Sequence, residues 1–62
     1  MFIQFWDNKS ECYFNARNVD YLKTTTVIVN GKRAVAWEVC CTGREPFALT
    51  KNRFTIEYIQ EA

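Results

Sequence analysis

Histidine is absent from this chain of 62 residues, and its absence removes several classes of enzyme chemistry. Without an imidazole, the sequence excludes a His-dependent catalytic triad, a His-ligated metal centre and acid–base catalysis by histidine. Glycine is scarce as well, and the isolated Gly31 and Gly43 form no phosphate-binding loop. No paired carboxylates, and no nucleophile with a base, stand at a useful spacing. We therefore expect a protein that is not an enzyme and binds no cofactor.

Long apolar runs are also missing. No stretch approaches the length of about 18 residues that a membrane-spanning helix needs, and no charged segment leads into a cleavable apolar leader. From this we expect a cytoplasmic protein without membrane association. Neither charge dominates, since eight Lys and Arg oppose seven Asp and Glu. A nearly neutral chain lacks the strong positive field that supports non-specific binding to nucleic acid.

Cysteine occurs only at Cys12, Cys40 and Cys41. The adjacent pair would need a strained vicinal bridge, so at most one ordinary disulfide can form. A structural zinc site normally has four ligands and a wider cysteine spacing. We expect reduced and mainly buried thiols, with no metal site and no catalytic residue among them.

The chain does contain the apolar material of one small core. Hydrophobic residues make up 48% and aromatic residues 16% of the sequence, a composition typical of a compact folded domain. A chain of this size buries only about 60% of its unfolded surface and does not divide into two cores. We expect residues 1–62 to form a single small β domain.

The N-terminal quarter has the pattern of a hairpin. Residues 2–6 are aromatic and β-prone, residues 7–10 are polar turn formers, and residues 11–14 return to strand composition. Asn15 can cap one helical turn, so a short helical turn within residues 15–22 is an alternative to continuous β structure.

The clearest local signal is Asn30-Gly31, which lies between the β-prone segments 24–29 and 33–39. This pair supplies the two positive-φ residues of a type I′ turn, and a two-residue loop fixes the strand register. The register places Lys23 opposite Glu38, where an ordinary surface ion pair is expected.

The same register sorts the hairpin side chains onto two faces. One face is predicted to join the core and carries Leu22, Ile28, Val35, Trp37 and Val39. The other is smaller but still apolar, with Val27, Val29, Ala34 and Ala36. A solvated sheet face normally reads polar, so we expect something to cover this second face.

In the C-terminal third, Pro46 predicts that residues 47–49 begin at a strand end or on a sheet edge. Residues 53–59 alternate over a strand period, although a helix capped by Thr50 is the alternative for residues 50–61. The fold class is thus all-β, or β with one short helical turn. We expect a small antiparallel sheet of five or six strands, arranged as a meander or as a curled barrel or sandwich, with the Asn30-Gly31 hairpin at its centre.

The function suggested by these features is binding. One thin sheet cannot hide this much apolar surface, so either a homodimer buries it or the outer hairpins curl over the central one. A short, non-catalytic chain of this kind suits an inhibitor or adaptor, as phages and mobile elements encode, that blocks a host protein. The alternative is a binder of a nucleotide or single-stranded nucleic acid. The candidate binding residues are the loop cations and two aromatics: Lys32, Arg33, Arg44, Lys51, Arg53, Trp6 and Tyr13.

Overall fold

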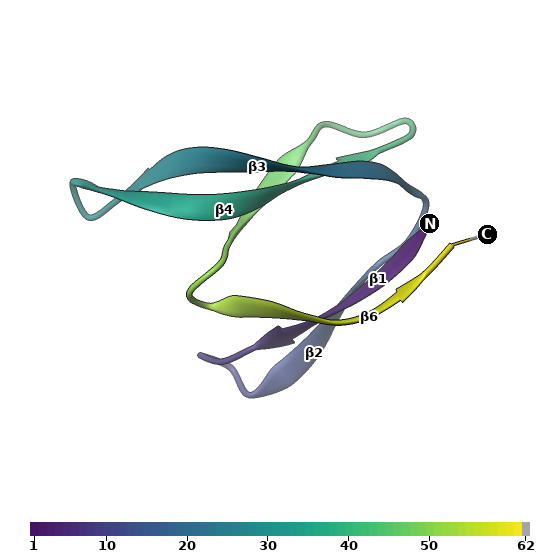
Figure 1. Ribbon diagram of the computed structural model, residues 1–62, viewed down its shortest axis with the longest axis horizontal. Helices are drawn as coiled ribbons and strands as arrows, with labels where there is room; N and C mark the ends of the chain where they lie inside the picture. Colours follow the sequence, from purple (N-terminus) through teal and green to yellow (C-terminus); the bar gives the residue numbers. More distant parts are fainter. Residues whose placement is uncertain (62) are drawn as a thin grey trace.

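The computed structural model describes residues 1–61 and shows six strands in two antiparallel three-stranded sheets. The strands are β1 (Phe2–Asp7), β2 (Cys12–Ala16), β3 (Val19–Val29), β4 (Lys32–Cys41), β5 (Phe47–Thr50) and β6 (Phe54–Gln60). The first sheet has the order β2-β1-β6 and the second the order β3-β4-β5. Figure 1 shows them as two layers: the chain begins in the first sheet, forms the whole second sheet and returns to the first with β6. The prediction of a small antiparallel β fold with five or six strands is confirmed.

The helical alternatives are wrong for the described residues. β2 continues to Ala16 and β3 begins at Val19, so no helical turn lies between them. The chain instead bends at Asn18, whose φ is 58°. Asparagine tolerates this left-handed conformation better than most residues, because its short polar side chain can hydrogen-bond locally. Residues 54–60 form β6, in agreement with their strand-like alternation.

The hairpin at Asn30-Gly31 is confirmed in both turn and register. Asn30 and Gly31 have φ values of 52° and 75°, as a type I′ turn requires. Val29 pairs with Lys32, and Lys23 faces Glu38 with their Nζ and Oε2 atoms 3.1 Å apart. The hairpin is not at the centre of one sheet, however, because β3 is an edge strand of the second sheet.

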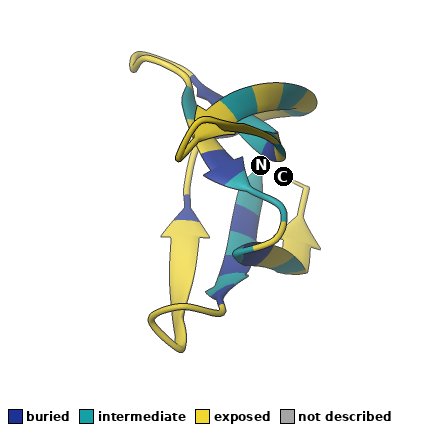
Figure 2. Cartoon of the chain, turned by 90° about the vertical axis from the view of Figure 1, so that its left-hand side faces the viewer, coloured by how far each residue is buried: buried dark blue, intermediate teal, exposed yellow. Residues whose placement is uncertain are grey.

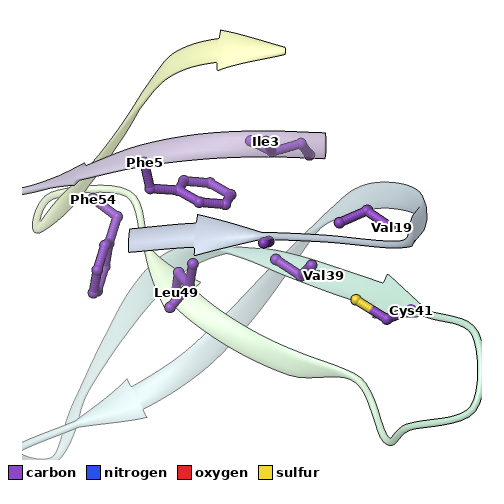
Figure 3. Close-up of a cluster of buried hydrophobic side chains, with 8 residues drawn as sticks. Ile3, Phe5, Val19, Val39, Cys41, Leu49 and Phe54 are labelled. Carbon is purple, nitrogen blue, oxygen red and sulfur yellow. The ribbon is translucent and has the colours of Figure 1, made fainter. Parts of the chain in front are cut away.

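The core lies between the two sheets. Ile3 and Phe5 of β1 are fully buried, as is Val39 of β4. Figure 3 shows these side chains together with those of both sheets that surround them. The complete cluster is Ile3, Phe5, Ala16, Val19, Val39, Cys41, Leu49 and Phe54. The ring centroids of Phe5 and Phe54 are 6.5 Å apart in an edge-to-face arrangement, a favourable geometry for packed aromatic rings.

Part of the predicted core face is wrong. Leu22 and Trp37 pack against the cluster, but Ile28 is 67% and Val35 is 49% exposed. The reason is length: β3 and β4 have 11 and 10 residues, whereas no strand of the first sheet exceeds seven. At about 3.3 Å per residue the hairpin is longer than the first sheet, which packs on it. Figure 1 shows the end of the hairpin projecting beyond that sheet.

The opposite face of the hairpin is only partly shielded. Ala36 is buried, whereas Val29 is 43% exposed. The expected cover therefore does not extend to the end of the hairpin within residues 1–61.

Candidate interaction surfaces

Aromatic side chains gather on the outer face of the first sheet. Because Ile3 and Phe5 point into the core, the alternation of β1 turns Phe2 and Trp6 outward. Figure 2 shows this alternation on β1, between β2 and β6. The neighbouring strands add Tyr13, opposite Trp6, and Tyr58, opposite Gln4. We call Phe2, Trp6, Tyr13 and Tyr58 the aromatic face.

The rings of the aromatic face form two contacts. The centroids of Trp6 and Tyr13 are 5.0 Å apart and those of Phe2 and Tyr58 are 6.4 Å apart. Tyr13 is 56% and Tyr58 is 51% exposed. A rigid sheet therefore presents ring edges and faces that can contact a partner with little loss of side-chain entropy.

Polar groups accompany these rings. Gln4 Nε2 donates a hydrogen bond to Asn15 Oδ1 at 3.2 Å. The guanidinium carbon of Arg17 lies 5.3 Å from the centroid of the Phe2 ring, within cation–π range. A pocket of about 470 Å³ at this end of the sheet is lined by Met1, Phe2, Arg17, Asn18 and Gln60. The arrangement can offer ring stacking, amide hydrogen bonds and one positive charge.

Arg53, one of the predicted binding residues, is held by an acidic partner. Its Nε and one terminal nitrogen each donate to a different carboxylate oxygen of Asp7 at 2.8 Å. Asp7 is 5% exposed and also accepts bonds from the backbone N–H groups of Lys9 and Ser10, at 2.9 and 3.2 Å. The hydrogen bonds from Arg53 hold the pKa of Asp7 well below its usual range. Arg53 thus joins two turns of the protein.

Lys51 is also engaged within the chain. Its Nζ donates to Thr24 Oγ1 at 3.2 Å and lies 4.0 Å from the centroid of the Trp37 ring. Among residues 1–61, the buried indole Nε1–H of Trp37 has no hydrogen-bond partner. This lysine fixes the turn after β5 against the second sheet.

The other predicted cations lie apart. Lys32 and Arg33 begin β4, whereas Arg44 follows its end and lies 5.3 Å from the centroid of the Phe47 ring. A strand of ten residues separates them by roughly 30 Å. The structure therefore brings Trp6 and Tyr13 together but does not gather the five cations on one surface.

The cysteines are free thiols. Cys12 is exposed, Cys41 belongs to the core cluster, and Cys40 is buried on the opposite face beside Tyr21. A hydrogen bond with Cys40 raises the pKa of Tyr21. In residues 1–61, no group of three or more Cys, Asp and Glu side chains could hold a metal ion. No helix in that range is long and apolar enough to cross a membrane.

Sequence reasoning missed Phe2, a member of the aromatic face, and Arg17 beside it. The signal was available for Phe2, because the period-two alternation of β1 places it on the same side as Trp6. Arg17 lies in the connection after β2, where alternation says nothing about direction.

Comparison with known proteins adds no family. No protein-family model matches the chain, and neither a curated protein nor a solved structure matches it.

Proposed function

We propose that this chain is a non-enzymatic interaction protein that acts as a homodimer and blocks a partner protein by covering part of its surface with the aromatic face. The observation that carries the proposal is the outer surface of the first sheet, where Tyr13 and Tyr58 are more than half exposed beside Trp6 and Phe2. Tryptophan, tyrosine and arginine are the side chains most often found as energetic centres of protein interfaces.

The geometry supports a protein partner because apolar contact area and polar groups alternate on the same face. Gln4 and Asn15 already satisfy one hydrogen bond of each side-chain amide, which lowers the cost of covering these groups on binding. Arg17 adds a positive charge at one end of the face. The proposed partner surface is therefore apolar, with an acidic group at its border.

The homodimer rests on a second surface. The end of the β3–β4 hairpin carries Ile28 and Val35 on one face and Val29 on the other, all at least 43% exposed. Apolar surface at a long, uncovered hairpin is typical of an interface. Pairing through the hairpin leaves both copies of the aromatic face free.

Binding of a nucleotide or single-stranded nucleic acid is the second candidate. The observation in its favour is the stacking of Arg17 on Phe2 next to a pocket, since proteins hold unpaired bases on aromatic rings and phosphates with arginine. The net charge of +1 and the engagement of Arg53 with Asp7 favour the protein partner instead.

Native mass spectrometry of protein purified from its own host distinguishes the candidates. We expect a dimer that retains a protein partner, with loss of the partner in Trp6→Ala and Tyr13→Ala although both variants stay folded by circular dichroism. Arg44→Ala is the control, because it removes an exposed cation outside the aromatic face. Retained nucleotide or nucleic acid that those aromatic variants release would support the second candidate. A monomer, or a partner that both aromatic variants retain, would contradict the proposal.

A further inference from the structure

β3 is the one long sheet edge in the described part of the chain. Of the other edge strands, β2 has five residues, β5 has four and follows Pro46, and β6 has a register shift against β1. β3 has 11 residues, and its last six, Thr24–Val29, are all β-branched, with no charge and no proline. Proteins usually protect edge strands with charges, prolines, bulges or short length. This half of β3 has none of these protections.

The register with β4 determines which backbone groups of β3 are free. Val29 and Lys32 flank a two-residue turn and so exchange both of their backbone hydrogen bonds. The alternation then directs the N–H and C=O groups of every second residue away from β4. These free positions are Leu22, Thr24, Thr26 and Ile28.

We infer that β3 pairs antiparallel with β3 of a second copy about a two-fold axis at Thr25, an inference that rests on the homodimer of the proposed function. In this register Leu22 lies opposite Ile28 of the partner subunit, and Thr24 opposite Thr26 of the partner subunit. All four free positions then meet one another, and each pair exchanges two hydrogen bonds. A shift by one such position places a free residue opposite either the Asn30 turn or the bulge between Val19 and Tyr21. The β3-β4-β5 sheets of the two copies then join through their β3 edges into one continuous sheet.

The side chains also match in this arrangement. Ile28, which is 67% exposed in one copy, comes to lie beside the half-buried Leu22 at the core end of the other. Each loses apolar surface to the other, and the symmetry repeats the contact. This match favours a second copy, since both halves of the contact are supplied by the same strand.

Charge complementarity points the same way. The turn of the hairpin is basic, with Lys32 and Arg33, whereas the base of β3 carries Asp20, exposed and bonded to Thr42 Oγ1 at 2.6 Å. Antiparallel pairing brings the basic turn of one copy beside Asp20 of the partner subunit. Lys23 does not oppose the pairing, because Glu38 of its own copy lies 3.1 Å away.

Proline substitution separates edge pairing from folding. Thr26→Pro removes an N–H that points to the free edge, where proline is tolerated, whereas Val27→Pro removes one that bonds to β4. In sedimentation at micromolar concentration we expect the unaltered chain to run at twice 7.3 kDa and Thr26→Pro to run as a folded monomer. Val27→Pro should lose β structure by circular dichroism. If Thr26→Pro stays folded and dimeric, the β3 pairing is refuted while the homodimer stands; an unaltered chain that is monomeric refutes both.

Cross-linking tests the register without relying on a disruptive variant. At the axis Thr25 faces itself in a non-hydrogen-bonded pair, with Cα atoms about 4.5 Å apart, which is within disulfide range. With Cys12→Ser to remove the exposed thiol, Thr25→Cys treated with oxidised glutathione should become a covalent dimer. Thr24→Cys and Thr26→Cys are matched controls that should cross-link with each other but not with themselves. A dimer in which Thr24→Cys joins to itself as readily as Thr25→Cys would overturn this register.

Discussion

Gly31 offers a test of the β3–β4 hairpin in which backbone conformation is separated from contact with distant atoms. The residue has a φ of 75°, in the left-handed region that disfavours side chains with a Cβ atom. A Cβ placed there would meet no atom within 4 Å. The loss of stability in Gly31→Ala must therefore come from the backbone and from the unfolded chain, because its Cβ makes no clash with a distant atom.

The expected loss depends on the side chain. A residue held in the left-handed region costs about 1 to 3 kcal/mol, while replacing glycine restricts the unfolded chain and returns about 0.4 to 1 kcal/mol. Gly31→Val, with a β-branched side chain, should have a left-handed cost toward the upper part of the range of about 1 to 3 kcal/mol. Gly31→Ala should lose about 1 kcal/mol or less, and Gly31→Asn should lose least. For a domain of this size each kcal/mol lowers the melting temperature by about 4 to 8 °C.

Thermal unfolding followed by circular dichroism measures this series. Lys32→Val is the control, because it introduces the same side chain one position later, at the extended start of β4. The control should melt close to the unaltered protein. If Gly31→Val also melts there, or if asparagine and valine at this position are equally stable, the type I′ turn does not constrain the hairpin in solution.

Three further outcomes are expected elsewhere in the molecule. Phe5→Ala should cost about 3 to 5 kcal/mol in urea unfolding, because the ring is fully buried and leaves a cavity, and a loss below about 1 kcal/mol would contradict the packing between the sheets. Cys41→Ala should lower the free energy of unfolding by about 1 to 3 kcal/mol while partner binding persists, because Cys41 is buried. Cys12→Ala should change neither stability nor binding, and loss of binding in either folded variant would assign a thiol to function. Because the pKa of Asp7 is lowered in the folded state, the stability that Asp7 contributes is present above its unfolded pKa of about 4 and is lost as the pH falls below that value. Asp7→Asn should therefore flatten the acid side of a plot of melting temperature against pH. An unchanged plot would count against the contact between Asp7 and Arg53.

Sequence reasoning was accurate where local chemistry decides the structure. Asn30-Gly31 determines a turn, the turn determines a register, and the register places Lys23 beside Glu38 as observed. The strand–turn–strand pattern of residues 2–14 likewise predicts the hairpin that β1 and β2 form. Each of these inferences spans only a short stretch of chain.

The failures have a common physical cause in distant partners. From the sequence alone Arg53 is interpreted as a free loop cation, whereas in the fold it bonds to Asp7, which lies 46 residues away in the chain. Ile28 reads as a core residue because its face is apolar, and only the shorter strands of the other sheet decide that it is exposed. No signal in one segment reports the length of the segment packed against it.

The return of the chain to its first sheet affects the order in which the molecule can assemble. The second sheet closes through a two-residue turn and one loop, so its strands meet at a small cost in chain entropy. In the first sheet β1 must find β6, where Phe2 pairs with Gln60 from nearly the other end of the chain. Such distant contacts form slowly, since loop closure precedes any gain from pairing. We therefore expect β6 to add Tyr58 to the aromatic face only after the β1–β2 hairpin and the exposed edge of β3 have formed.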